Sequence, residues 1–132
     1  MAGKTMRSMR TPLARVRGLG SAKEGVHHWW AQRLTALALV PLVLWFVVSV
    51  AGLAGMDHAG AVGWIGSPPV AVLLVVLIAA TFWHGQLGVQ VVIEDYVHNE
   101  AVKLTALIAV KFAAILMAVA SIFAVLRLAF GG

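Results

Sequence analysis

Three side-chain types that can do chemistry lie close together in the second half of the sequence: an imidazole, a carboxylate and a phenol. His84 lies inside an apolar run, and Asp95 and Tyr96 follow it by eleven and twelve positions. On an α-helix, eleven residues make three turns plus about 20°, so His84, Gly88 and Asp95 would share one face. The helical rise would separate His84 from Asp95 by ~16 Å. With Asp95 and Tyr96 at the water boundary of a membrane span, His84 would lie near the bilayer midplane.

An imidazole at that depth can ligate a metal, with haem iron as the best candidate, or can simply hydrogen-bond a neighbouring helix. Polar residues inside a membrane are costly and are usually functional, which favours ligation by His84. Gly85 and Gly88 would let a flat macrocycle approach, although small residues also serve ordinary helix packing. The other four histidines, at 27, 28, 58 and 98, lie outside the apolar runs. A second axial ligand would therefore come from a partner subunit.

The polar residues that flank the apolar runs have two readings. In the first reading, Tyr96 is simply an interfacial tyrosine, Asp95 is a solvated aspartate, and Arg33 serves only to set the topology. If the three lie at one level, a phenol and a guanidinium there could instead bind a quinone carbonyl or haem propionates. Lys111 would snorkel to the same interface.

Composition predicts the setting of these residues. Of the 132 residues 61% are hydrophobic and only 11% charged, and the mean hydropathy is +0.94. A soluble domain needs more polar surface, so the chain is predicted to be an all-α membrane protein. Without cysteine it can form neither disulfides nor thiolate metal sites. Its small size indicates one subunit of a larger, heteromeric helical bundle.

Three uncharged or nearly uncharged runs predict three transmembrane helices, at about 34–56, 68–93 and 104–126. Pro41 should kink the first span. Residues 55–67 are expected to be a short loop, and Ser67 with Pro68 resembles a helix start. The predicted organisation is a basic N-terminal segment, 1–33, followed by a three-helix transmembrane anchor, 34–132.

Charge asymmetry orients the predicted spans. Residues 1–33 carry seven Lys or Arg against one acid, a net charge of +6 (7 − 1), whereas the 57–67 loop has no basic residue. The positive-inside rule then puts the N-terminus and Tyr96 on the cytoplasmic side. The expected location is a bacterial inner membrane, with the mitochondrial inner membrane as the alternative because the leader also resembles a transit peptide. Nucleic-acid binding is not expected, because the basic tract adjoins a span and lacks a recognition fold.

Two groups of residues resemble one known family. His84-x3-Gly88 followed by Asp95-Tyr96, and Gly25-Val26-His27 followed by Arg33-Leu34-Thr35-Ala36, resemble the small hydrophobic membrane anchor of succinate dehydrogenase, complex II. The resemblance covers roughly residues 25–110, and the histidine and Asp-Tyr spacing is its most specific part. Gln90 and Lys111 depart from the family pattern.

The resemblance implies roles for the matching residues. His84 would be an axial ligand of haem b, shared with the second membrane anchor (cytochrome b) subunit, and Arg33 would lie near the haem propionates. Tyr96, with Asp95 beside it, would bind the ubiquinone that is reduced. Electrons would arrive from succinate through a flavoprotein subunit and an iron–sulfur subunit, so the chain would belong to an enzyme without being catalytic alone.

Other functions stay open at the sequence level. The chain could anchor a fumarate reductase, which runs the same chemistry in reverse, or use menaquinone in place of ubiquinone. It could also be a haem-free structural anchor. A small transporter or proton-conducting subunit would use His84 as a protonation site, but only Lys111 adds a second ionisable residue along such a path.

Overall fold

The computed structural model describes residues 23–131, and this part of the chain is helical, without strands. Its helices are α2 (Lys23–Gly52), α3 (His58–Gly66), α4 (Pro68–Tyr96) and α5 (Glu100–Ala129). Three of them are long and apolar enough to cross a membrane, over Gly25–Gly52, Pro68–Tyr96 and Glu100–Ala129. The predicted all-α class with three transmembrane helices is confirmed. Residues 1–22 of the predicted basic segment lie outside the described residues.

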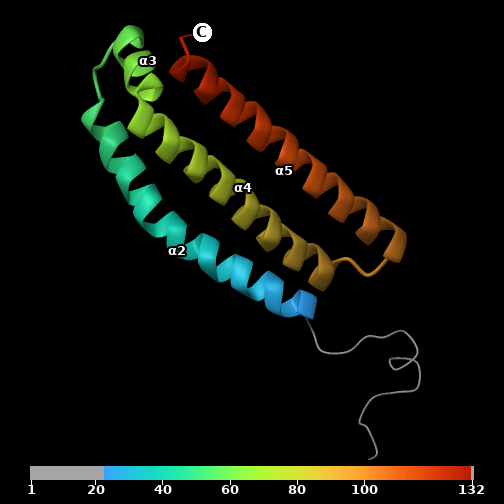
Figure 1. Ribbon diagram of the computed structural model, residues 1–132. Helices are drawn as coiled ribbons and strands as arrows, with labels where there is room; N and C mark the ends of the chain where they lie inside the picture. Colours follow the sequence, from blue (N-terminus) through green and yellow to red (C-terminus); the bar gives the residue numbers. More distant parts are fainter. Residues whose placement is uncertain (1–22, 132) are drawn as a thin grey trace, which may run out of the picture.

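Helix α4 is the centre of the arrangement, with α2 on one side and α5 on the other (Figure 1). Short connections make neighbouring helices antiparallel, and α2 and α5 do not pack on each other within the described chain. The three long helices therefore form a layer, in which α4 has two faces that neither α2 nor α5 covers. We call the end where α4 meets α5 the polar end, and the opposite end the α3 end.

The packed core lies at the α3 end. Ala71, Leu74 and Leu77 of α4 are buried there together with Val125 of α5. The half-buried rings of Trp45 and Trp64 stack beside them, with centroids 5.9 Å apart. Most other large apolar side chains are exposed. In water this surface would be very unfavourable, but lipid and partner helices can cover it.

The 55–67 segment differs from its expected loop structure, because it contains α3. Asp57 caps this helix by accepting a hydrogen bond from the Gly60 amide at 2.8 Å. At its other end, a Cβ on Gly66 would lie 2.8 Å from the Leu128 carbonyl oxygen, so glycine allows α3 to approach α5. Three glycines disfavour an isolated helix of nine residues, and packing on α4 and α5 stabilises it instead.

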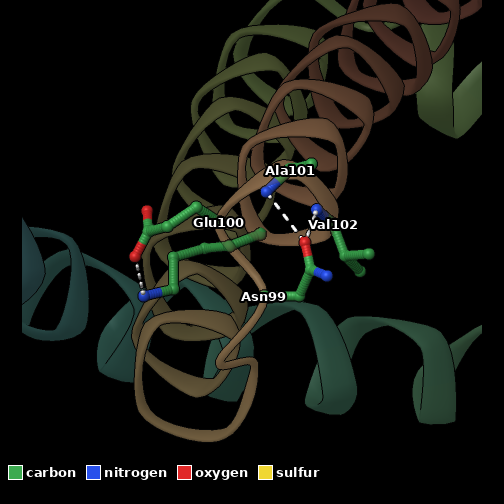
Figure 2. Close-up of polar contacts among 5 residues, drawn as sticks. Asn99, Glu100, Ala101 and Val102 are labelled. Carbon is green, nitrogen blue, oxygen red and sulfur yellow. Dashed lines mark hydrogen bonds and ion pairs between the residues drawn. The ribbon is translucent and has the colours of Figure 1, made fainter.

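The first and third long helices begin before the apolar runs that predict the spans. Helix α2 starts at Lys23, so the boundary expected after Arg33 falls inside a continuous helix, which curves along its length and passes through Pro41 without a break (Figure 1). Helix α5 starts at Glu100 because the Asn99 carboxamide accepts from the amides of Ala101 and Val102, at 3.0 and 3.2 Å (Figure 2). Both helices thus begin at charged residues that precede their apolar runs in the sequence.

Candidate functional site

His84, Asp95 and Tyr96 lie on one uninterrupted helix, so the predicted continuity of this segment is confirmed. The His84 side chain is half-buried, whereas Asp95 is exposed. Tyr96 is the last residue of α4, and 77% of its surface is exposed. The phenol therefore lies at the polar end, where a ligand or a partner subunit can reach it.

Thr35 of α2 contacts His84, the candidate metal-ligating residue. Its Oγ1 lies 3.0 Å from Nδ1 of His84, and the same oxygen lies 2.6 Å from the Ala31 carbonyl oxygen and 3.1 Å from that of Gln32. Sequence reasoning gave Thr35 no role. The two residues are 49 positions apart, and only the packing of α2 against α4 brings them together.

This contact fixes the register of the two antiparallel helices and corrects the expected level of Arg33. With Thr35 opposite His84, Arg33 lies level with Gln86, nine residues and ~13 Å short of Asp95. Arg33 therefore lies farther from the polar end than Asp95 and Tyr96. The expectation from the sequence that the three residues lie at one level is corrected. Its guanidinium carbon lies 5.3 Å from the centroid of the Trp29 ring, one turn toward the polar end.

Lys111 of α5 lies at the same level, because it lines two hollows together with Gln86. From Gln86 to the start of α4 at Pro68 there are eighteen residues, or ~27 Å, which nearly equals the hydrocarbon thickness of a bilayer. Arg33 and Lys111 thus fit the edge of the hydrocarbon region, and the last turns of α4 extend beyond it. His84 lies two residues, ~3 Å along the axis, farther from the polar end than Gln86, and its expected depth near the midplane stays a prediction.

The face of α4 beside His84 is open. A Cβ on Gly85 or on Gly88 would meet no atom within 4 Å. Tyr96 follows Gly85 by eleven residues and so shares its side of the helix. This glycine face can accept a flat group or another helix against the α4 backbone.

No other histidine of the described chain reaches the His84 level. His27 and His28 lie on α2, with His28 ~10 Å beyond Thr35 along the axis. His58 begins α3 at the opposite end, and His98 follows α4. Within residues 23–131 no three His, Cys, Asp or Glu side chains gather as a metal site. His84 is therefore a single donor that needs an external partner to complete a two-ligand site.

Two polar atoms on α2 are buried without a hydrogen-bond partner in the described chain: Nε2 of His28 and Oε1 of Gln32. His28, Gln32 and Thr35 recur at helical spacing and lie along one side of α2. Buried polar groups normally have partners. Their side of α2 leads from the polar end toward His84.

Comparison with known proteins gives consistent matches. The family model of the succinate dehydrogenase/fumarate reductase transmembrane subunit matches residues 7–120. A succinate dehydrogenase hydrophobic membrane anchor subunit of Rickettsia bellii (strain RML369-C) is 37% identical over 116 residues, covering 88% of this chain and 93% of the relative. That of Paracoccus denitrificans is 30% identical over 121 residues, covering 92% and 93%. A succinate dehydrogenase membrane anchor subunit of Reclinomonas americana is 32% identical over 100 residues, covering 70% and 80%.

Proposed function

Because the chain belongs to the family of succinate dehydrogenase/fumarate reductase transmembrane subunits, we propose that it is the membrane anchor of a succinate:ubiquinone oxidoreductase. It would hold a flavoprotein and an iron–sulfur subunit at the membrane and pair with a second anchor subunit, the cytochrome b subunit. Succinate would be oxidised in the peripheral subunits, and ubiquinone would be reduced at the polar end of this bundle. The anchor itself carries no catalytic group for succinate.

We further propose that His84 ligates haem b through Nε2, and the Thr35 contact carries this assignment. A threonine hydroxyl has one proton. The 2.6 Å separation from the Ala31 carbonyl oxygen indicates that this proton is donated within α2. Oγ1 then accepts a hydrogen bond from Nδ1–H of His84, at 3.0 Å. In that tautomer Nε2 keeps its lone pair for a metal, as in other sites where a ligand histidine donates its second N–H.

The surroundings of His84 fit a haem. The open space at Gly85 and Gly88 gives a macrocycle access to the helix surface. The lack of a second histidine at this level of the described chain fits a ligand pair shared with the partner anchor. Arg33 lies close to the His84 level, which favours haem propionates over quinone as its partner. Bound haem would supply a one-electron redox centre; Thr35, Arg33 and the glycine face would orient and accommodate it.

For ubiquinone we propose Tyr96, with Asp95 beside it. Tyr96 can donate its phenolic hydrogen to a quinone carbonyl, and its 77% exposure leaves the hydroxyl free to do so. Asp95 is an exposed carboxylate on the adjacent face of the last turn and can hold a water or a proton near the head group. The iron–sulfur subunit would cover both residues and complete the pocket.

Replacing Thr35 by valine should weaken haem binding, because Nδ1–H of His84 loses its acceptor while the side-chain shape is kept. Loss of such a partner typically lowers metal affinity by about 10- to 100-fold, and we expect the lower end of this range. The complex, purified through a tag on this chain, is measured by its reduced-minus-oxidised spectrum and by redox titration of the b-type signal. Thr35→Ser keeps the hydroxyl and should therefore show the wild-type spectrum and the wild-type redox titration of the b-type signal.

Thr105→Val is the matched control, because Thr105 makes the same bond to its own helix, to the Ala101 carbonyl oxygen at 2.8 Å, and is exposed. An unchanged spectrum and potential in Thr35→Val would contradict the tautomer assignment. A purified wild-type complex that does not oxidise succinate with an artificial acceptor would contradict the anchor function itself.

Orientation is tested separately, by labelling single cysteines in a chain that has none. The basic N-terminal segment predicts a cytoplasmic N-terminus. Ala59→Cys in the exposed part of α3 should therefore react with an impermeant maleimide in intact cells, and Ser21→Cys only after lysis. The reverse pattern would move the polar end, and the proposed quinone site with it, to the outer side of the membrane.

A further inference from the structure

Helices α4 and α5 enclose a groove that the proposed haem and quinone sites do not use. Its larger part has a volume of about 290 Å³ and an apolar lining that includes Ala79, Phe82, Ala118 and Ile122. Gln86 and Lys111 line it too, and they also line an adjoining hollow of about 180 Å³, with Gln90 and Leu107. The groove thus has an apolar length and one polar end, as an amphipathic ligand requires.

The polar end offers hydrogen-bond donors and a positive charge. Gln86 donates to Gln90, and Gln90 donates to Glu94, both at 3.1 Å. Each carboxamide has a second N–H that this ladder does not use. Lys111 is exposed and makes no ion pair with a carboxylate of the described chain, since the carboxylate of Glu94 lies two turns beyond Gln86. The groove end is complementary to an anion.

The position of the groove separates it from the haem side. Gln86 follows His84 by two residues and so points about 200° away from it around α4. The second anchor subunit can therefore complete the His84 site without covering the groove. Lys111 lies at the level of Arg33, near the hydrocarbon edge, where an ammonium group can reach a lipid phosphate while the groove runs toward the bilayer interior.

We propose that this groove binds an anionic phospholipid. Its phosphate would pair with Lys111 and accept hydrogen bonds from Gln86 or Gln90, and one acyl chain would lie between α4 and α5 along Ala79, Ala118 and Ile122. Basic pockets between transmembrane helices commonly bind anionic head groups. A lipid there would fill the open apolar surface between the two helices away from the packed core, and so would stabilise the bundle by mass action.

The test uses the purified, delipidated complex and native mass spectrometry with added phosphatidylglycerol or phosphatidylcholine. Phosphatidylglycerol should bind more tightly to the wild type, and Lys111→Met should weaken it about fivefold while leaving phosphatidylcholine unchanged. Lys103→Gln is the matched control, because Lys103 is a nearby cation already paired with Glu100 at 3.6 Å, and it should bind as the wild type does.

A second variant tests the apolar part. Ala118→Phe should fill the groove and weaken phosphatidylglycerol binding while Lys111 is still present, and thermal unfolding without lipid shows whether that variant remains folded. Equal binding of the two lipids, equal binding by Lys111→Met and the Lys103→Gln control, or no lipid bound because a partner helix occupies the groove would each overturn the proposal. If Ala118→Phe unfolds, the shorter Ala79→Leu takes its place, with the same expected loss.

Discussion

Replacing His84 by alanine should abolish the b-type haem spectrum of the complex. His84 is the only histidine of the described chain at the Thr35 level, and the other four lie on other turns or helices. Thr35, the side chain that contacts His84, is a poor iron ligand and should not substitute for it. A haem left with one axial histidine would be high-spin or lost. The measurement is the reduced-minus-oxidised spectrum, with haem content from extraction.

His98→Ala is the matched control, because His98 is exposed beyond the end of α4 and should leave the spectrum unchanged. Assembly is followed by co-purification of the peripheral subunits and by succinate oxidation with an artificial acceptor. Wild-type haem content and an unaltered spectrum in His84→Ala would remove this residue from the site. They would then favour a haem-free structural anchor, or one in which haem is held by the partner alone.

Replacing Tyr96 by phenylalanine should lower quinone reduction about tenfold, because it removes a single hydrogen-bond donor and keeps the ring. A net hydrogen bond contributes about 0.5–1.5 kcal/mol, and ~1.4 kcal/mol lost from the transition state is a factor of ten in rate. The measurement is steady-state succinate:ubiquinone reductase activity. Because Tyr96 lies about eighteen ångströms along the helix from His84, by twelve steps of ~1.5 Å, the haem spectrum should stay intact.

The control for Tyr96→Phe is succinate oxidation by an acceptor that bypasses quinone, which should remain near normal. An equal fall in both assays would mean that Tyr96 supports assembly. A normal quinone rate would exclude it from the site. Asp95→Asn is informative beside it, since Asp95 lies about 100° around the helix and its loss should not reproduce the Tyr96 effect.

Register also separates the roles proposed for Arg33 and Tyr96. From the sequence alone the two could share one site, because each borders an apolar run. The Thr35–His84 contact moves Arg33 ~13 Å toward His84 from the Asp95 level. Arg33 thus belongs with the proposed haem and Tyr96 with the proposed quinone. The start of the apolar run does not mark the start of this helix, because α2 already begins at the charged residue Lys23, ten residues before Arg33.

Local composition determined much of this protein. The apolar runs predicted three membrane-spanning helices, and the helical period correctly put His84 and Asp95 on one continuous helix, since both properties depend only on neighbouring residues. The chemistry available to His84 and Tyr96 also follows from residue type and surroundings. The family resemblance added the roles that these residues are proposed to play.

Only the tertiary structure decided how the helices meet. The α3 helix forms in a glycine-rich segment because Trp64 stacks on Trp45 and Gly66 approaches Leu128. Thr35 lies against His84 across 49 residues, and Lys111 lies level with Gln86. Apolar periodicity specifies which side of a helix is buried but not its axial position against a neighbour. That position depends on side-chain interdigitation along the whole contact, which is why the level of His84 against α2 and the partner of its Nδ1 emerged only from packing.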